Sequence, residues 1–486
     1  MSLSRRAFLG SVAAFAAADG LGLANGSPRL KFGVLSDIHI YPLRPEGSVE
    51  RFLTALRYFR DHGADAVVIA GDLADWGIVT QIDAVIDAWQ QVFPGGKAPD
   101  GREVARLFVC GNHDLEGQWY NYDKRYGVPK EMFADEHSIL CNLKTIWPKL
   151  TGFPYDDLWI RDVKGYKFVG CNKLQYPKDC TFLEDHRAEL EGANPFFYIQ
   201  HFHPQGTCSA PWVWGQDEGW STKALSRFPN AVAFSGHSHT PLVDERTIWQ
   251  GGFTSVGTAS LRYLISFGGR ENSFAFGMPY EEHEQMPRLN LGNAANGLLV
   301  TIYDDCMILE RMDFAVGSKI ADDWVVPLPY DGSLAFGKRA ARSPVPQFAE
   351  GAEVTVSPVS KGKDRKGRPT DQVTVSFPPA DGSRRAFDYE VTVEASDVDI
   401  AKPWKVKRVF SDGYYRPPAY DGDKVECVFA VSELPGRYEI RETCHTHGQK
   451  GLNYRFAVRP VNCFGAKGAP LYTNWLEGDR IWKGTL

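Results

Sequence analysis

The sequence predicts an α/β layered core followed by an all-β sandwich, and three observations lead to this fold class. Between residues 31 and 303, short and almost continuously apolar strands alternate with amphipathic helices, as in sheets that are buried on both faces. Residues 327–350 are rich in Pro, Gly, Ala and basic residues, which indicates a linker. Beyond the linker, apolar and polar residues alternate between turn residues, which is typical of a β-sandwich.

Each element of the α/β part has its own signal. Apolar residues recur at helical spacing in two segments that are followed by Gly63 and Pro94, which predicts helices at 49–62 and 80–93. Short apolar runs predict strands at residues 31–36, 66–70, 105–110, 166–171, 196–200, 231–235 and 298–303. In the C-terminal part, strict alternation predicts strands at 372–377 and 387–393.

The N-terminal segment carries an export signature. Residues Ser4 to Gly10 (SRRAFLG) resemble the twin-arginine export signal of bacteria, and the apolar stretch Ala7–Ala18 that overlaps it has the length of a signal peptide core. We therefore expect residues 1–26 to be a signal peptide and the protein to be periplasmic or extracellular. The expected domains are then a catalytic domain at 28–326, a linker at 327–350 and a β-sandwich at 351–486.

Composition excludes several classes of protein. The net charge is -6, from 60 acidic and 54 basic residues, so no nucleic-acid partner is expected. No apolar run reaches the ~20 residues that a membrane-spanning helix needs, so no membrane span is expected. Nine cysteines are present without a CxxC pair, and their pairing in an oxidising compartment cannot be deduced from spacing.

Five short polar motifs each follow a predicted strand. Carboxylate oxygens, imidazole nitrogens and amide oxygens are ligands for divalent metal ions, and residues at i and i+2 beyond a strand end point to the same side. Burying such a cluster is costly unless an ion compensates it. The motifs are Asp37-Ile38-His39, Gly71-Asp72-Leu73-Ala74-Asp75, Gly111-Asn112-His113-Asp114, His201 and Gly236-His237-Ser238-His239.

The order of these motifs resembles that of the calcineurin-like metallophosphoesterase superfamily, over about residues 30–314. The resemblance implies a four-layer α/β/β/α sandwich with two divalent or mixed-valence metal ions (Mn, Fe, Zn or similar). It assigns His113 as the general acid and Asp114 as the residue that orients it. It assigns Asp72 as the bridge between a first metal at Asp37, His39 and His239 and a second metal at Asn112, His201 and His237.

Two further positions qualify the resemblance. Purple acid phosphatases carry Tyr where this chain has Asp75, so we expect no iron–tyrosinate centre and interpret Asp75 as a hydrogen-bond acceptor behind a metal ligand. His203 is interpreted as a contact to the substrate phosphate, with a supporting role outside the substrate site as the alternative. The Cys444–His447 cluster is interpreted as a turn, since no matching Cys/His group provides further metal ligands.

The predicted function is that of an exported metal-dependent phosphoesterase that hydrolyses small phosphate mono- or diesters with a dimetal-bridged hydroxide. A nuclease with the same motifs and a non-catalytic, metal-stabilised binding protein are the alternatives. Residues 454–465 resemble a strand of fibronectin type III modules. The C-terminal module is therefore a candidate for contact with a surface or a protein partner.

Overall fold

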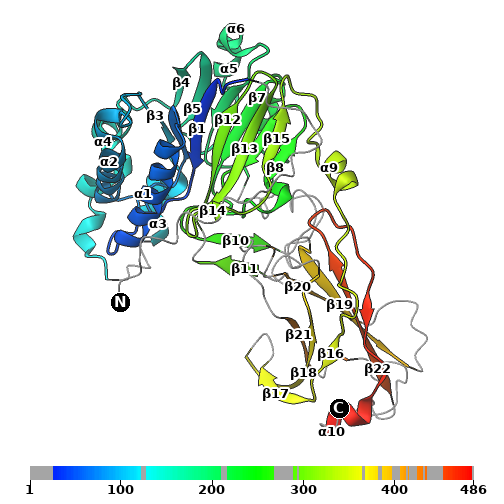
Figure 1. The fold of residues 1–486 in the computed structure, drawn as a ribbon. Helices are drawn as coiled ribbons and strands as arrows, with labels where there is room; N and C mark the ends of the chain where they lie inside the picture. The colour runs from blue at the N-terminus through cyan, green and yellow to red at the C-terminus, as the bar shows by residue number, and fades with distance from the viewer. Residues whose placement is uncertain are drawn as a thin grey trace.

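The computed structural model describes most of the chain, and its two parts are drawn in Figure 1. Residues 1–25 of the predicted signal peptide and the Cys444–His447 cluster lie outside the described residues. Among the described residues, no helix combines the length and the apolar character needed to cross a membrane. The described residues are 26–121, 127–208, 216–267, 288–292, 295–363, 367–380, 386–396, 405–411, 414, 424–430, 433–434 and 452–483.

One sheet of the α/β part has the strand order β14-β13-β12-β1-β2-β3, with β15 paired to β13. Strands β1, β2 and β3 are parallel, and β12 joins β1 in antiparallel register. The bounds are β1 Leu30–Leu35, β2 Ala66–Ala70, β3 Ala105–Val109, β12 Asn296–Ile302, β13 Cys306–Asp313, β14 Ser318–Lys319 and β15 Trp324–Pro327.

The second sheet has the order β4-β5-β6-β7-β9-β8, and its strands β5, β6, β7 and β9 are parallel. A separate hairpin, β10 with β11, follows it. The bounds are β4 Leu158–Val163, β5 Tyr166–Cys171, β6 Phe196–Ile199, β7 Ala231–Ser235, β8 Ile248–Gln250, β9 Thr254–Gly257, β10 Leu264–Phe267 and β11 Arg288–Leu291.

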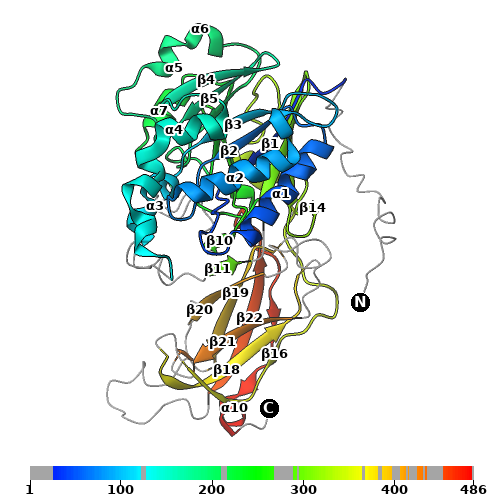
Figure 2. The same ribbon diagram turned by 90° about the vertical axis from the view of Figure 1, so that its left-hand side faces the viewer.

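Helices cover the outer faces of the two sheets, which gives the layered arrangement seen in Figures 1 and 2. One buried cluster joins the helices α1, α2 and α4 to the first sheet, and another joins α5–α7 to the second. Between the sheets, the Phe32 ring packs edge-on against Phe168 and Phe234, at centroid distances of 5.2 and 5.9 Å. The helix bounds are α1 Glu46–Asp61, α2 Val79–Val92, α3 Asn112–Asn121, α4 Ile139–Thr151, α5 Phe182–Asp185, α6 Arg187–Leu190 and α7 Trp220–Leu225.

Among its described residues, the C-terminal part is all-β apart from one short helix, and its two sheets enclose a common apolar core. Val375 of one sheet and Val391 and Phe456 of the other are completely buried in that core. The bounds are β16 Thr355–Val356, β17 Ser360–Lys363, β18 Pro369–Phe377 and β21 Val425–Ala430, then β19 Asp388–Ala395, β20 Lys405–Phe410, β22 Asn453–Val461, β23 Leu471–Tyr472 and β24 Leu476–Glu477, and finally α10 Gly478–Lys483.

The predicted linker contains structure that the sequence analysis did not anticipate. Helix α9, Phe336–Arg342, lies within it and docks on the α/β part. The Arg339 guanidinium donates hydrogen bonds to the Ile248 carbonyl at 2.7 Å and to the Glu245 carboxylate at 2.8 Å. At least one basic residue of the predicted linker, Arg339, is therefore buried and forms an ion pair.

The two parts also touch directly. The Arg246 guanidinium lies 4.6 Å from the ring centroid of Phe387, and the Tyr414 hydroxyl donates to the Val243 carbonyl at 2.9 Å. The predicted fold class, an α/β part followed by an all-β part, is confirmed.

Candidate metal centre and active site

All predicted ligands lie beyond the carboxyl ends of parallel strands. Asp37 and His39 follow β1, Asp72 follows β2, and Asn112 begins helix α3 directly after β3. The second sheet contributes residues from the ends of β6 and β7, which are His201, His237 and His239. Open α/β sheets bind ligands at this end because neighbouring parallel strands deliver their following loops to one place.

The backbone at the site adopts an uncommon conformation. Five of the predicted metal ligands have positive φ angles, in the left-handed region that costs free energy for residues other than glycine. Such torsions persist where the surrounding structure fixes them, and they cluster at functional sites. The values are 51° for Asp37, 47° for His39, 54° for Asp72, 65° for His237 and 52° for His239.

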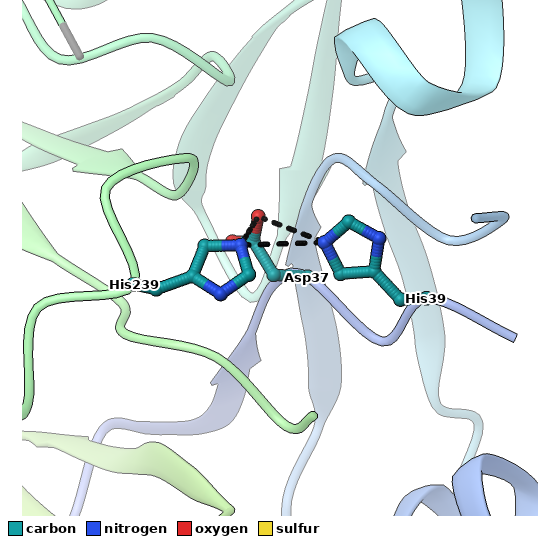
Figure 3. A group of neighbouring side chains, drawn as sticks. All are labelled: Asp37, His39 and His239. Atoms are coloured by element: carbon teal, nitrogen blue, oxygen red, sulfur yellow. Dashed lines mark hydrogen bonds and ion pairs between the residues drawn. The ribbon is translucent and has the colours of Figure 1, made fainter. Parts of the chain in front are cut away.

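Three side chains form the first ligand group, drawn in Figure 3. The Nε2 atoms of His39 and His239 lie 3.3 Å apart, and the same atoms lie 3.7 and 3.0 Å from Asp37 Oδ1. All three side chains are buried, and Asp37 Oδ1 accepts no hydrogen bond from the described residues. Two imidazole nitrogens and an unsatisfied carboxylate oxygen that face one another fit a divalent cation.

The second group consists of Asp72, His201 and His237, with Asn112 beside it. His201 Nε2 lies 2.9 Å from Asn112 Oδ1 and 3.2 Å from Asp72 Oδ2. The same Asp72 oxygen lies 3.7 Å from His39 Nε2 of the first group. Asp72 therefore stands between the two groups.

The electrostatics of the cluster also suit a cation. Burial alone would raise the pKa of Asp72, but the His201 and His113 imidazoles lower it below its ordinary value. Burial acts to lower the pKa of His39, whereas the Asp37 and Asp75 carboxylates raise it to about 10. Carboxylates that stabilise positive charge on buried imidazoles stabilise a metal ion at the same place, with release of the protons.

Close packing of the loops depends on glycine. A Cβ atom on Gly111 would lie 2.1 Å from Asp72 Oδ1 and 2.3 Å from the Asp72 backbone nitrogen. Gly71 has a φ of +89°, and a Cβ there would lie 2.5 Å from His201 Nδ1. The glycines that precede the motifs thus let ligand-bearing loops approach each other.

His113 is the most accessible residue of the predicted catalytic set. Its side chain keeps 27% of its surface exposed, and its ring packs edge-on against His39 at a centroid distance of 4.6 Å. Nδ1 lies 2.7 Å from the Asp75 carbonyl oxygen, so Nδ1 donates and Nε2 carries the lone pair in the neutral ring. Burial lowers the pKa of His113 below its ordinary value.

The position of Asp114 differs from the prediction. Its carboxylate does not orient the His113 ring, because it accepts hydrogen bonds from three backbone N–H groups, those of Leu73 (3.3 Å), Ala74 (2.8 Å) and Gly111 (2.8 Å). Burial and the Asp72 carboxylate raise the pKa of Asp114 to about 7, against the effect of these N–H groups. Asp114 ties the Asp72 loop to the start of α3, and the Asp75 carbonyl orients the imidazole instead.

Asp75 has the supporting position that the sequence analysis gave it. Its Oδ1 lies 3.0 Å from His39 Nδ1, and its Oδ2 accepts from the Arg262 guanidinium at 3.0 Å. Arg262 also donates to the His39 carbonyl at 2.8 Å. The sequence analysis missed Arg262 and its neighbour Tyr263. Their position in the sequence could have indicated them, because they follow strand β9 in the way that the metal-ligand motifs follow other strands.

His203 is completely buried, and its Nε2 lies 2.9 Å from the Ser238 hydroxyl. This burial does not add support to the predicted contact with the substrate phosphate, which stays a prediction. The contact joins the loop after β6 to the loop that carries His237 and His239. This position matches the supporting role that was the alternative interpretation.

Comparisons with known proteins agree with the motifs. Residues 30–241 match the calcineurin-like phosphoesterase family. Among curated proteins, no sequence matches this chain significantly. Residues 30–241 thus lie within a calcineurin-like metallophosphoesterase domain, and the protein that carries it is a phosphoester hydrolase.

Several solved structures are similar at low sequence identity. A dimetal phosphatase from Danio rerio is 13% identical, covers 63% of this chain and 100% of its own, and has a TM-score of 0.34. GAP50, the anchor in the inner membrane complex of Plasmodium, is 11% identical, with coverage of 62% and 89% and a TM-score of 0.34. A predicted phosphoesterase from Streptococcus pneumoniae is 11% identical, with coverage of 63% and 99% and a TM-score of 0.25. Because these TM-scores are low, we draw no functional conclusion from them.

Proposed function

We propose that the protein is an exported phosphoesterase with two metal ions that hydrolyses small phosphate mono- or diesters. Asp37, His39 and His239 hold one ion, and Asn112, His201 and His237 hold the other. The observation that carries this proposal is the position of Asp72 Oδ2, which lies 3.2 Å from His201 Nε2 and 3.7 Å from His39 Nε2. A carboxylate oxygen that faces imidazoles of both groups fits a bridging ligand.

The chemistry follows from the groups present. Bound divalent ions supply Lewis-acid activation of water and neutralise charge on the phosphate oxygens. The water oxygen bonds to phosphorus and the bond from phosphorus to the leaving oxygen breaks, which yields an alcohol and either inorganic phosphate or a monoester. In its imidazolium form, His113 donates its Nε2 proton to the leaving oxygen and becomes the neutral ring, whose Nδ1–H stays on the Asp75 carbonyl and holds the ring in place. Manganese, iron and zinc all accept this donor set.

Activity and metal content on one preparation test the proposal. Full-length protein is loaded with manganese, iron or zinc, analysed for metal, and assayed with 4-nitrophenyl phosphate, bis(4-nitrophenyl) phosphate and single-stranded DNA. We expect turnover of at least one nitrophenyl ester and none of DNA. Turnover of DNA alone identifies a nuclease, and no turnover with any metal identifies a non-catalytic protein.

The export proposal rests on the sequence of residues 4–18 and has a separate test. Replacing Arg5 and Arg6 together by Lys is expected to retain the protein in the cytoplasm of a bacterial host, because the pair of arginines defines the twin-arginine export signal. Unchanged fractionation of the double variant contradicts the assignment. We also propose that residues 351–486 form a fibronectin type III-like module that contacts a surface or a protein partner.

A further inference from the structure

A basic cavity adjoins the first ligand group. Its volume is about 430 Å³, within the range of small-molecule sites. It opens between the start of helix α1 and the segment between β9 and β10. The lining residues are Tyr41, Arg44, Gly47, Ser48, Arg51, Arg262, Tyr263 and Gly292.

The cavity shares a wall with the metal-site residues. The Tyr263 ring lies 4.3 Å from the His239 ring, centroid to centroid. Ser48 donates from its hydroxyl to the His39 carbonyl at 3.1 Å, and Arg262 donates to the same carbonyl at 2.8 Å. A molecule in this cavity therefore sits next to the residues that hold the first metal, on the side where Tyr263 and Arg262 lie.

The cavity carries arginine side chains, and two of them form no ion pair with a carboxylate of the described residues. Arg262 is paired with Asp75, whereas Arg51 donates to two carbonyl oxygens of the described residues, those of Arg262 (2.6 Å) and Gly292 (3.4 Å). Arg44 is exposed, and neither Arg44 nor Arg51 forms an ion pair with a carboxylate among the residues that the structure describes. Burial and then Arg262 lower the pKa of Arg51, while Asp313 acts in the opposite direction. Two guanidinium groups are thus available to an anion.

The cavity also offers apolar surface for a spacer. The Arg262 guanidinium lies 5.3 Å from the ring centroid of Tyr41, and Tyr263 contributes a second ring to the lining. Aromatic faces beside guanidinium groups suit a short carbon chain that ends in an anion.

We propose that this cavity binds a second anionic group on the leaving alcohol, so that the substrates are phosphoesters that carry a further phosphate or carboxylate group. The inference rests on the proposed function, because it places the scissile phosphate at the metal centre. A neutral leaving group would leave Arg44 and Arg51 without an anion. The second group is retained on the alcohol that leaves, and only the bond at the scissile phosphorus breaks.

Three esters with the same three-carbon spacer test the proposal on full-length, metal-loaded protein. They are propyl phosphate, 1,3-propanediol bisphosphate and 3-(phosphonooxy)propanoate. We expect kcat/KM for the bisphosphate or the carboxylate ester to exceed that for propyl phosphate by about tenfold or more, since charge-assisted hydrogen bonds are the strong ones. The ester with the higher value identifies which anion the cavity accepts.

Matched variants assign the preference to the cavity. Arg44→Ala is expected to reduce the preference for the second anion about tenfold, and Arg44→Lys to restore part of it. Arg57→Ala removes an exposed arginine of helix α1 that lies outside the cavity, and we expect it to leave the preference unchanged. Calorimetric titration with propane-1,3-bisphosphonate and propylphosphonate provides a binding readout that does not depend on turnover, with the same expected order.

The results distinguish failure of the cavity proposal from failure of the phosphoesterase proposal. Equal kcat/KM values for the three esters, or a preference that Arg44→Ala and Arg57→Ala change alike, overturn the cavity proposal and leave the phosphoesterase proposal intact. Absence of turnover for all three esters and for 4-nitrophenyl phosphate overturns the proposed function. In that case, tighter binding of the bisphosphonate to wild type than to Arg44→Ala still supports an anion site.

Discussion

Gly111→Ala is expected to disable the site although glycine holds no metal ion. The added Cβ would lie 2.1 Å from Asp72 Oδ1 and 2.3 Å from its backbone nitrogen, whereas real Cβ contacts are essentially never shorter than 3.0 Å. The Asp72 loop therefore has to move by roughly 1 Å. A misplacement of about 1 Å costs on the order of 10²-fold in rate, and overpacking costs about 1–3 kcal/mol of stability.

The assay compares kcat/KM for 4-nitrophenyl phosphate, metal content and thermal unfolding of the variant with those of Gly192→Ala. Gly192 has nothing within 4 Å of its added Cβ, so it reports the cost of the substitution itself. We expect the control to match wild type and Gly111→Ala to lose about 100-fold in kcat/KM. Wild-type activity and metal content in Gly111→Ala would refute the packing of the Asp72 loop described above.

His113→Ala is expected to lose on the order of 10²–10⁴ in rate for alkyl phosphates and far less for nitrophenyl esters, because only the basic alkoxide needs a proton; equal losses, measured by kcat on both esters, contradict a general acid. Glu245→Gln is expected to cost about 3 kcal/mol at neutral pH, because it leaves Arg311 and Arg339 without their carboxylate. These arginines lower the pKa of Glu245 against the effect of burial, so its stabilisation is complete above the unfolded value of about 4.5 and is lost as pH falls through the folded value. Urea unfolding should show the difference between wild type and Glu245→Gln shrink below about pH 4.5, and a constant difference argues against the ion pair. A chain that ends at Ser343 exposes the surface that Phe387 and Tyr414 cover, and calorimetry should show a lower Tm with metal content retained; an unchanged Tm contradicts a stabilising contact.

The sequence predicted the architecture of the site better than the roles of its supporting residues. The predicted metal ligands follow strands that the sequence marks clearly as apolar runs, such as β2 and β7. Because parallel strands end at the same edge of a sheet, the convergence of these ligands could be predicted. The family resemblance assigned Asp114 to orient His113, whereas its carboxylate turns back to the loop after β2. Such a contact depends on the tertiary approach of two loops, which spacing does not encode.

The linker structure and the cavity also depend on tertiary contacts that the sequence does not encode. The composition of residues 327–350 is that of a solvated segment, and only the position of Glu245 in the folded chain gives the buried Arg339 a carboxylate partner. Arg44 and Arg262 lie far apart in the sequence and carry no motif. Their shared cavity results from the packing of helix α1 against the segment after β9.

The proposed function depends most on Asp72 as the ligand shared by both metal ions, and metal analysis of Asp72→Asn tests this role most directly. We expect wild type to hold about two ions per chain, as two-metal sites do. We expect Asp72→Asn to hold fewer and to lose more than about 100-fold in kcat/KM, and the exposed-carboxylate control Asp304→Asn to match wild type. An Asp72→Asn protein that retains both ions and full activity would contradict the proposed centre.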